Sequence, residues 1–569
     1  MKRLLFCITL FVMPLSTFAQ MTTEDNVTSP IIAATNAQLK NAALDSAMSL
    51  GWLDAPLSAS GDGYYLISHA SQINWGESCP PDPLRQVKTY GGFLDPYANE
   101  QWVKRTCKRL NGYCINTAET FTYTFTSFAS GLTDVVNLWF TSIYNPGGAE
   151  RLAFIHEENV NITGINCAQQ EWTLGTNRIG LAYSSDSGNT WKYLGRIAAP
   201  YREQVQLPNG SIVQLNVEGT PYYIYNGDFY IWYKDQNRSA VSIAVSKANV
   251  ASVLAAARAG NLGSNLWQKK SIYGWNSDIA AEPAFPDTAG EYGIMHSQAA
   301  RAADGNYYIL TTRQAAVGAS GWEYSYVRLF TVNPVTLAWT KKMDIVNEHM
   351  STFNPDNRGK GYQYASLVDP LGRANGEVGS AFYVYSAKFQ DSDPPFKQAL
   401  YQWQVNTTPP ADFYKESRGF IGVQGYNQWS YESVLSRQPM IWNAEGYWQR
   451  PDWQQPTDIY NRIYKGAAST GQYDGFLMIW TAPKTGTVTV RQTVRSAQPN
   501  PSCGDGVNFA FQKNDALQFY GHIDWDDTLG KSSVLSIPVV GGDQLYFYGT
   551  KGGTNYCDTL FWDPSISYN

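Results

Sequence analysis

The stretch Ser184-Ser185-Asp186-Ser187-Gly188-Asn189-Thr190-Trp191 decides the fold of this chain. It reads S-x-D-x-G-x-T-W and lies between two strand-like runs, Arg178 to Tyr183 and Lys192 to Ile197. Asp186 can accept hydrogen bonds from the backbone of its own turn, Gly188 can adopt a positive φ, and Trp191 can pack under the hairpin. The pattern therefore predicts a tight hairpin between two strands of an all-β fold.

The same eight residues resemble the Asp-box, a hairpin turn on the outer strands of sialidase-like and related β-propellers. In that family the turn is structural and lies away from the active site. The resemblance therefore implies a propeller of a carbohydrate-related kind, and it gives the turn itself no catalytic residue.

Residues 61–405 are a succession of short β-like runs separated by turn residues. Within them a repeating unit combines a strand, a turn with Gly, an aromatic strand, and a strand that alternates apolar residues with Ser. The units lie near 60–145, 151–197, 217–247, 290–333 and 361–404. Each has the size of a four-stranded blade. We therefore expect a five-bladed β-propeller, interrupted by one helix from Lys247 to Gly260.

The start of the chain has the features of a secretion signal. Met1-Lys2-Arg3 is basic, Leu4 to Pro14 is apolar, and Thr17-Phe18-Ala19 is a small-residue cleavage site. The apolar run is too short for a permanent membrane anchor, and no later segment approaches the required length. We expect a secreted protein, extracellular or periplasmic. The predicted parts are a signal peptide at 1–19, an N-terminal extension at 20–60, the propeller at 61–405, a linker at 406–419 and a second all-β domain at 420–569.

The C-terminal region resembles a jelly-roll module that is often attached to secreted carbohydrate-active and adhesive bacterial proteins. The resemblance rests on Gln424-Gly425-Tyr426-Asn427-Gln428-Trp429-Ser430-Tyr431 and on Gly542-Asp543-Gln544-Leu545-Tyr546-Phe547, among other landmarks. It implies a β-sandwich. Two roles stay open for it: sugar binding, and structural support of the propeller.

The cysteines predict disulfides. Six remain once Cys7 leaves with the signal, and an even number in an exported protein favours pairing. They are Cys79, Cys107, Cys114, Cys167, Cys503 and Cys557. Cys503 and Cys557 are alone in the C-terminal part and are expected to pair. The other four allow three connectivities, of which we favour Cys107–Cys114 with Cys79–Cys167.

The amino-acid composition of the chain narrows the classes of molecule that it is expected to bind. Charged residues are 16% and aromatic residues 14% of the chain, and the formal net charge is −6. The negative charge and the lack of basic runs argue against nucleic acid. Aromatic residues favour strands but also stack on sugar rings, so we expect a polysaccharide or glycan partner. No cysteine has a histidine at the spacing typical of a zinc site, and we predict no cofactor. The available oxygen ligands would suit a structural calcium ion, although no spacing of these residues requires one. The oligomeric state stays open.

The propeller segment also resembles the five-bladed propellers of several glycoside hydrolase families, where acidic residues project from the innermost strands into a central funnel. Glycoside hydrolysis needs one protonated and one ionised carboxyl group. The resemblance implies catalytic roles for Glu157, Glu158 and Glu218, with Glu218 at the place of the third-blade general acid. The residues expected to bind substrate are His156, Glu282, His296 and Arg313.

Two classes of function stay open. The first is a glycoside hydrolase that cleaves a polysaccharide or glycoconjugate, with retention or inversion undecided. The second is a noncatalytic lectin or adhesin, which is favoured by the lack of a clean first-blade aspartate; the nearest acids are Asp62 and Glu77. A sialidase is a lesser alternative, because Arg178 or Arg313 can be nominated for its arginine triad but the triad is not assembled.

Overall fold

The computed structural model describes most of the chain beyond residue 136 and shorter segments before it. The described residues are 27–34, 58–59, 65–68, 88–92, 121–128, 137–160, 175–201 except 189, 204–206, 210, 212–219, 221–287 except 238–239, 298–317, 322–350, 361–407 except 370–372, 374 and 391–396, 412–450, 461–497 except 472–473, 505–554 and 558–569. Nearly all of the regular structure in these ranges is strand. The helices there are α2 (Val250–Ala259), the one-turn α3 (Glu416–Gly419) and the short 3-10 helix η6 (Tyr426–Gln428).

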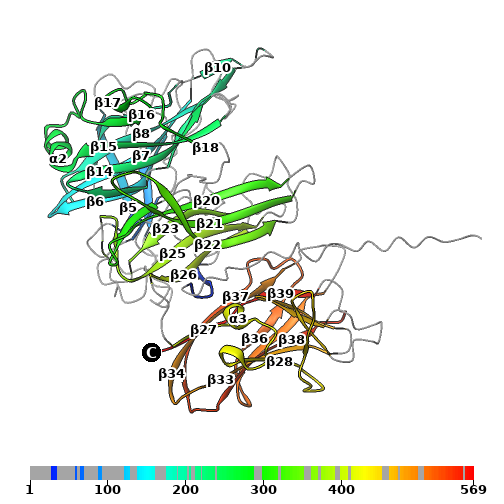
Figure 1. Cartoon of the computed structure of the whole chain (residues 1–569). Coiled ribbons are helices and arrows are strands. Elements are labelled where there is room, and N and C mark those ends of the chain that lie inside the picture. The colour runs from blue at the N-terminus through cyan, green and yellow to red at the C-terminus, as the bar shows by residue number, and fades with distance from the viewer. Residues whose placement is uncertain are drawn as a thin grey trace, which may run out of the picture.

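Five consecutive groups of strands form the blades of a β-propeller (Figure 1). The first blade is β2 (Ser58–Ala59), β3 (Tyr65–Ser68), β4 (Lys88–Gly92) and β5 (Phe121–Phe128), and the second is β6 (Asn137–Gly147), β7 (Glu150–Val160), β8 (Gly175–Ser184) and β9 (Thr190–Ala198). A parallel pairing of β5 with β9 joins these two blades into one eight-stranded sheet. The third blade is β12 (Val217–Glu218) and β13 (Tyr222–Tyr225), then β14 (Asp228–Asn237), β15 (Ala240–Asn249), β16 (Gln268–Ser271), β17 (Gly274–Asn276) and β18 (Phe285–Asp287).

The fourth blade is β19 (Gln298–Ala302), β20 (Tyr307–Val317), β21 (Trp322–Val332) and β22 (Trp339–Met350), with β24 (Glu377–Val378) beside β19. The fifth is β23 (Gly361–Val368), β25 (Ala381–Gln390), β26 (Lys397–Asn406) and β1 (Ile31–Ala34), and the hairpin of β10 (Gln204–Gln206) and β11 (Ile212–Gln214) lies between the second and third blades in the sequence.

Contacts between successive blades close the array into a ring. The first strand of the first blade, β2, contacts both β6 and β23, which are the first strands of the second and fifth blades. Strand β8 contacts β12, β13 contacts β19, and β19 contacts β23. The predicted all-β fold with a five-bladed β-propeller is therefore confirmed by the order and contacts of the chain's own sheets.

The turn at 184–191 forms the bonds that its sequence predicts. The Asp186 carboxylate accepts hydrogen bonds from the Thr190 backbone N–H at 2.8 Å and from the Thr190 hydroxyl at 2.6 Å. Gly188 has a φ of 85°, and Trp191 is 1% exposed while its indole N–H donates to the Gly188 carbonyl at 2.9 Å. All of these partners are local, so eight residues specify the hairpin between β8 and β9.

Two predicted boundaries in the propeller were wrong. The second blade begins at Asn137 and not near residue 151, because β6 pairs forward with β7 in a hairpin that brings Asn137 opposite Glu158. Helix α2 begins at Val250 and not at Lys247, because β15 continues to Asn249. The Asn249 side chain caps the helix by accepting from the Ser252 N–H.

The C-terminal region is a sandwich of two antiparallel sheets, which confirms the predicted β-sandwich. The larger sheet contains β27 (Phe413–Lys415), β29 (Ile441–Trp442), β30 (Trp448–Gln449), β31 (Arg462–Tyr464), β32 (Ala467–Ser469), β34 (Gly486–Ser496), β37 (Lys531–Val539), β39 (Thr559–Trp562) and β40 (Ser565–Tyr568). The smaller sheet has the order β28 (Trp429–Ser433), β33 (Phe476–Thr481), β38 (Gln544–Lys551), β35 (Val507–Lys513) and β36 (Ala516–Ile523). Aromatic residues such as Trp480, Phe547 and Trp562 fill the core between the sheets.

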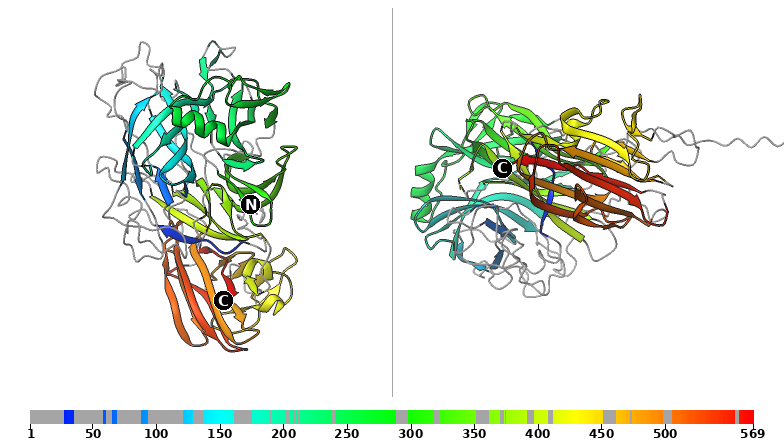
Figure 2. Two further views of the ribbon diagram at one scale, coloured as in Figure 1. Left: turned by 90° about the vertical axis from the view of Figure 1, so that its left-hand side faces the viewer. Right: turned by 90° about the horizontal axis from the view of Figure 1, so that it is seen from below.

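The N-terminal strand β1 lies between the propeller and the sandwich (Figure 2). It completes the fifth blade by pairing with β26. It also bonds to the sandwich: the Ile32 N–H donates to the Ser532 hydroxyl at 2.7 Å, and the Thr493 hydroxyl donates to the Pro30 carbonyl at 2.5 Å. One short segment thus belongs to both parts of the molecule.

Candidate functional site

The antiparallel order of each blade brings most of the predicted site residues to one face of the propeller. Strands β7, β14 and β20 end on the face where β12, β19 and β23 begin. Glu157 and Glu158 lie near the end of β7, Glu218 lies in β12, and Arg313 lies in the second half of β20. The turn at 184–191 joins the opposite ends of its strands, so it lies on the other face.

Glu157 is fully buried in an ion pair. One carboxylate oxygen accepts from Arg196 Nε at 2.9 Å and from Arg196 Nη2 at 2.7 Å, and the other accepts from the Tyr193 hydroxyl. The Glu157 side chain has no exposed surface, and that of Arg196 is 21% exposed. Burial and the charge of Glu157 raise the pKa of Tyr193 well above its usual range, so the hydroxyl remains the donor. Both oxygens of this carboxylate are therefore engaged by protein groups.

Gly180 makes room for this arrangement. A Cβ atom at Gly180 would collide with the ring and hydroxyl of Tyr193. Gly180 lies on β8, directly opposite Ile155 of β7. A glycine at this position is what allows the tyrosine to reach Glu157 across the sheet.

The structure also describes the side chains of two residues that were predicted to bind substrate, His156 and Glu282. His156 is 2% exposed and lies between Trp139 of β6 and Ile179 of β8 in the sheet register. Glu282 is half-buried, and it belongs to the end of the third blade and not to the start of the fourth. Its neighbour Pro283 forms a β-bridge with Ser271 of β16, and the following strand, β18, pairs with β15. Because β14 and β15 lie between this edge and β12, the backbone of Glu282 is separated from the first strands of the blades.

The remaining predicted residues are placed by backbone register alone, or lie outside the described residues. Glu158 is opposite Asn177, Glu218 is opposite Lys234, and Arg313 is opposite Tyr326. The residues outside the described ranges are His296 and all six cysteines, namely Cys79, Cys107, Cys114, Cys167, Cys503 and Cys557.

One hydrogen bond joins the second and third blades at this face. The backbone N–H of Asn177 donates to Asn216 Oδ1 at 2.7 Å. Asn177 is the register partner of Glu158, and Asn216 precedes Glu218 by two residues. The bond therefore holds the strand positions of Glu158 and Glu218 near one another.

A second buried ion pair supports the third blade, and sequence reasoning did not find it. Lys269 Nζ lies 2.5 Å from Asp235 Oδ2, and neither side chain has exposed surface. Lys269 also donates to the Ala199 carbonyl, and Asp235 accepts from the Tyr201 N–H. Burial raises the pKa of Asp235 and lowers that of Lys269, because each charge has lost its water. Asp235 is opposite Val217 in the sheet, so the pair fixes the strand that carries Glu218.

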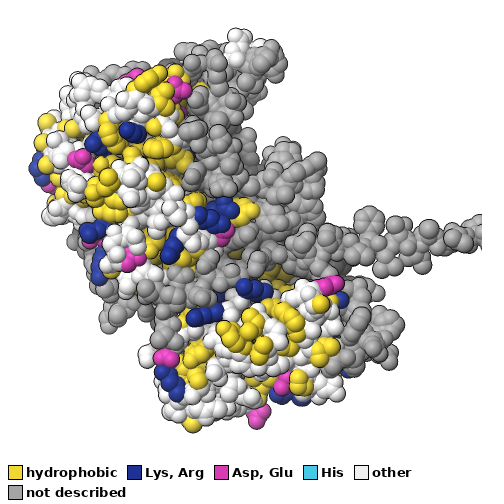
Figure 3. Space-filling model, viewed as in Figure 1, with side chains coloured by type: hydrophobic (Ala, Val, Ile, Leu, Met, Phe, Trp, Pro, Cys, Tyr) yellow, Lys and Arg dark blue, Asp and Glu magenta, His cyan; other side chains and the backbone are white. Residues whose placement is uncertain are grey.

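The described surface shows no concentration of one charge in the view of Figure 3, where acidic and basic side chains are interspersed among apolar ones. Among the described residues, no group of three or more His, Cys, Asp or Glu side chains is arranged to hold a metal ion. None of the helices in those ranges is long and apolar enough to cross a membrane.

Comparison with known proteins finds similarity in structure only. No protein family and no curated protein matches the chain in sequence. The similar solved structures include an exo-β-1,3-galactanase from Phanerochaete chrysosporium, at 11% identity and a TM-score of 0.32, covering 88% of this chain and 95% of the other. They include a GH32 β-fructofuranosidase from Bombyx mori, at 10% identity and a TM-score of 0.28, covering 85% and 89%. The C-terminal CBM6 of a marine laminarinase from Zobellia galactanivorans matches at 12% identity and a TM-score of 0.14, covering 27% of this chain and 99% of the other.

Proposed function

We propose that this protein is a secreted glycoside hydrolase that cleaves a polysaccharide or glycoconjugate at the face of the propeller where β7 ends and β12 begins. The observation that carries the proposal is the hydrogen bond between Asn177 and Asn216, which joins the strand positions of two glutamates from different blades. Acid-assisted glycoside cleavage requires two carboxyl groups at one glycosidic bond, and these two strand positions each carry a glutamate.

In this proposal Glu218 is the general acid and Glu158 is the ionised partner. Two neighbouring carboxyl groups resist simultaneous ionisation, so one of them keeps its proton at higher pH than it would alone. The protonated group gives its proton to the glycosidic oxygen as the bond to the sugar carbon breaks. In the same step the ionised group either activates a water molecule that attacks the sugar carbon, or attacks that carbon itself. In the second case a glycosyl-enzyme forms, and water activated by the first carboxyl group then hydrolyses it; the distance between the two carboxyl groups decides between the two routes.

Glu157 takes a positioning role in the same proposal. Its carboxylate is buried and bound to Arg196 and Tyr193, so it does not reach water or substrate in this arrangement. Its negative charge acts through the sheet that carries Glu158. Adjusting the acid therefore fits this geometry better than activating water, because both oxygens of the Glu157 carboxylate are already bound.

The export features of the sequence fit the same function. The signal segment at 1–19 and the even set of cysteines are those of a protein that works outside the cytoplasm, where polymeric glycans are available. The Asp-box resemblance of the 184–191 turn agrees with a carbohydrate-related propeller.

The test is an assay of reducing ends released from plant, algal and bacterial polysaccharides and from sialylated and arabinosylated glycans. Wild type is compared with Glu218→Gln and Glu158→Gln, and Glu282→Gln serves as the matched control because it lies at the outer edge of the third blade. We expect release by wild type and by the control, and a loss of at least a hundredfold in both other variants.

The assay also separates the enzyme from the alternative. If wild type releases nothing but binds glycans on an array, the protein is a lectin or adhesin and the catalytic assignments are wrong. If Glu282→Gln loses activity while Glu218→Gln retains it, the proposed face is not the active site.

A further inference from the structure

The smaller sandwich sheet has two edge strands, β28 and β36, and only one of them is covered. An edge strand presents a row of backbone N–H and C=O groups without a partner in its sheet, and such a row can bind a further strand. Globular proteins normally cover this row, or place charges and prolines along it. The two edges of this sheet differ in both respects.

Segments on either side of β28 in the sequence cover its free edge. The Gln424 side chain accepts from the Tyr431 N–H at 2.8 Å and donates to the Tyr431 carbonyl at 2.9 Å. The Met440 N–H donates to the same carbonyl at 2.9 Å, and the Gly425 N–H donates to the Trp429 carbonyl at 2.7 Å. The chain itself therefore closes this edge to another strand.

The opposite edge strand, β36, has no comparable cover. Within the described part of the chain, its backbone bonds only to β35 and to its own Gln518, whose side chain donates to the Ala516 carbonyl at 3.1 Å. Tyr520 in the middle of the strand is 70% exposed. No Asp, Glu, Lys, Arg or Pro occurs between Ala516 and Ile523. The strand itself thus lacks the charges and prolines that normally keep edge strands apart.

The part of β36 that can pair regularly is 519–523. Over these residues β36 keeps an unbroken register with β35, from Phe519 opposite Phe511 to Ile523 opposite Val507. Gln518 is an extra residue relative to β35 and forms a bulge, which ends the regular edge on that side. A further strand would therefore pair with residues 519–523.

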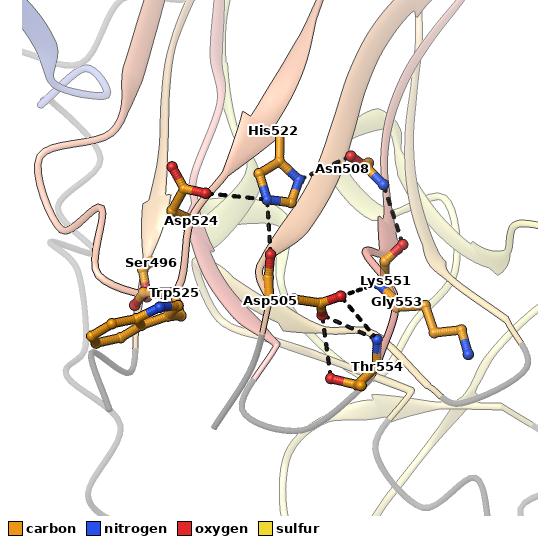
Figure 4. A network of polar contacts seen from close by, with 9 residues as sticks. All are labelled: Ser496, Asp505, Asn508, His522, Asp524, Trp525, Lys551, Gly553 and Thr554. Atoms are coloured by element: carbon orange, nitrogen blue, oxygen red, sulfur yellow. Dashed lines mark hydrogen bonds and ion pairs between the residues drawn. The ribbon is translucent and has the colours of Figure 1, made fainter. Parts of the chain in front are cut away.

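Side-chain bonds already hold the end of this segment in place. His522 Nδ1 lies 2.9 Å from Asn508 Oδ1, and His522 Nε2 lies 2.9 Å from the Asp505 carbonyl oxygen. Figure 4 shows the imidazole directed toward both groups. The Asp505 carboxylate in turn accepts from the Thr554 N–H at 3.0 Å, which ties the strand to a neighbouring loop. Because the edge is ordered beforehand, a partner strand would cost little conformational entropy on this side of the contact.

A second copy of this chain fits the edge by symmetry. A strand that pairs antiparallel with its own copy is related to it by a two-fold axis, so the unpaired groups of both copies are satisfied at once. An axis at Gly521 pairs all of 519–523, with Tyr520 opposite His522 of the partner subunit. An axis at any other residue leaves part of this segment unpaired. No like charges face one another among these pairs.

The charges nearest to 519–523 are compatible with this pairing. Asp524 follows the segment directly, and its side chain is 71% exposed. The axis at Gly521 sets Asp524 of the partner subunit opposite the uncharged Gln518 and not opposite another acid. Lys531 supplies a cation beside the axis, since a Cβ atom at Gly521 would lie 3.4 Å from Lys531 Cδ. Each copy thus brings an anion and a cation to the contact.

We propose that the mature chain forms a symmetric dimer through β36, in which residues 519–523 of two copies pair antiparallel about Gly521. The two five-stranded sheets would then join into one sheet of ten strands, five from each copy. A contact of this size belongs to the weak, concentration-dependent associations. The dimer is independent of the proposed hydrolysis and needs no glycan.

Sedimentation velocity of the full mature chain, from about 5 to 200 µM, measures this association. Tyr520→Lys places a charge in the middle of the edge, as natural edge strands often do, whereas Tyr520→Phe keeps an uncharged ring there. The matched control is Val423→Lys, because Val423 is 56% exposed and lies next to Gln424 at the covered edge.

A cysteine cross-link tests the geometry of the pair separately. Antiparallel pairing about Gly521 leaves the two copies of residue 520 about 8 Å apart between Cα atoms, within reach of a short bismaleimide. Tyr520→Cys should therefore give a covalent dimer, and Val423→Cys should not. Wild type treated in the same way shows the background from its native cysteines.

We expect wild type, Tyr520→Phe and Val423→Lys to shift from monomer toward dimer as the concentration rises. Tyr520→Lys should raise the dissociation constant about tenfold or more. The proposal is overturned if wild type stays monomeric over the whole range, or if Tyr520→Lys associates as wild type does. It is also overturned if Tyr520→Cys gives no more covalent dimer than Val423→Cys.

Discussion

Replacing Glu157 with glutamine is expected to lower the stability of the propeller and, through that, its activity. The wild-type carboxylate receives two bonds from Arg196 and one from Tyr193 at a position without exposed surface. Glutamine keeps an oxygen for Arg196, and the Tyr193 hydroxyl can turn to accept from the new amide, so the main loss is the negative charge. Breaking a fully buried pair costs about 3–5 kcal/mol, but Arg196 is partly exposed, so we expect a loss of about 2–3 kcal/mol.

Differential scanning calorimetry of the full chain measures this loss. A cost of that size should lower the transition of the propeller by about 3–4 °C. Arg196→Gln and the double variant Glu157→Gln/Arg196→Gln complete a thermodynamic cycle, and the control is Glu282→Gln, whose side chain is half-buried at the edge of the third blade. The coupling free energy should exceed about 1 kcal/mol.

Two results would refute this reasoning. The first is a Glu157→Gln variant that unfolds at the wild-type temperature, which would mean that the ion pair adds nothing to the fold. The second is full loss of hydrolysis in Glu157→Gln with unchanged stability, which is the behaviour expected of Glu218→Gln and would make Glu157 a direct participant in the reaction.

Three further variants test other parts of the structure. Asp186→Ala removes the acceptor of two bonds from Thr190, and urea unfolding should show a loss of about 1–3 kcal/mol, with a smaller loss for Asp186→Asn. Gly180→Ala forces a methyl group against Tyr193, so the melting temperature should fall by the equivalent of about 1–3 kcal/mol, and an unchanged value would contradict the close approach. Burial, together with the charge of Asp505, raises the pKa of Asp558 to about 7. The stability that its protonated form contributes is present below about pH 4 and is lost as the pH rises through 7, so the melting temperature of Asp558→Asn should rise relative to that of wild type between pH 5 and 8. Melting temperatures that run parallel for the two proteins over this pH range would disprove this.

The sequence was most informative where the interacting residues are close together in the chain. The 184–191 turn was predicted in detail because Asp186, Thr190 and Trp191 bond within one hairpin. The start of the second blade was mispredicted because a run of strand residues can pair with the strand before it or after it, and local pattern does not distinguish the two. Here the run pairs forward, with Asn137 opposite Glu158.

The candidate site could be predicted only in part, since its partners come from distant positions. Glu157 was selected as an acid at a strand end, but its partner Arg196 is 39 residues away. Asp235 and Lys269 are 34 residues apart and carry no motif. Composition and spacing detect carboxylates, whereas only the fold shows which of them are already bound to a cation.

The position of β1 affects the order in which the parts of the molecule can fold. Strand β1 is made before the other described strands of the propeller, yet Ile31 in β1 pairs with Gln402, which belongs to β26 of the fifth blade. A nascent chain folds as its segments emerge, so β1 cannot pair with β26 until the propeller sequence between them has been made. Its bonds to Ser532 and Thr493 come later still. Completion of the ring and docking of the sandwich therefore depend on the same few residues, and a partly synthesised chain has neither.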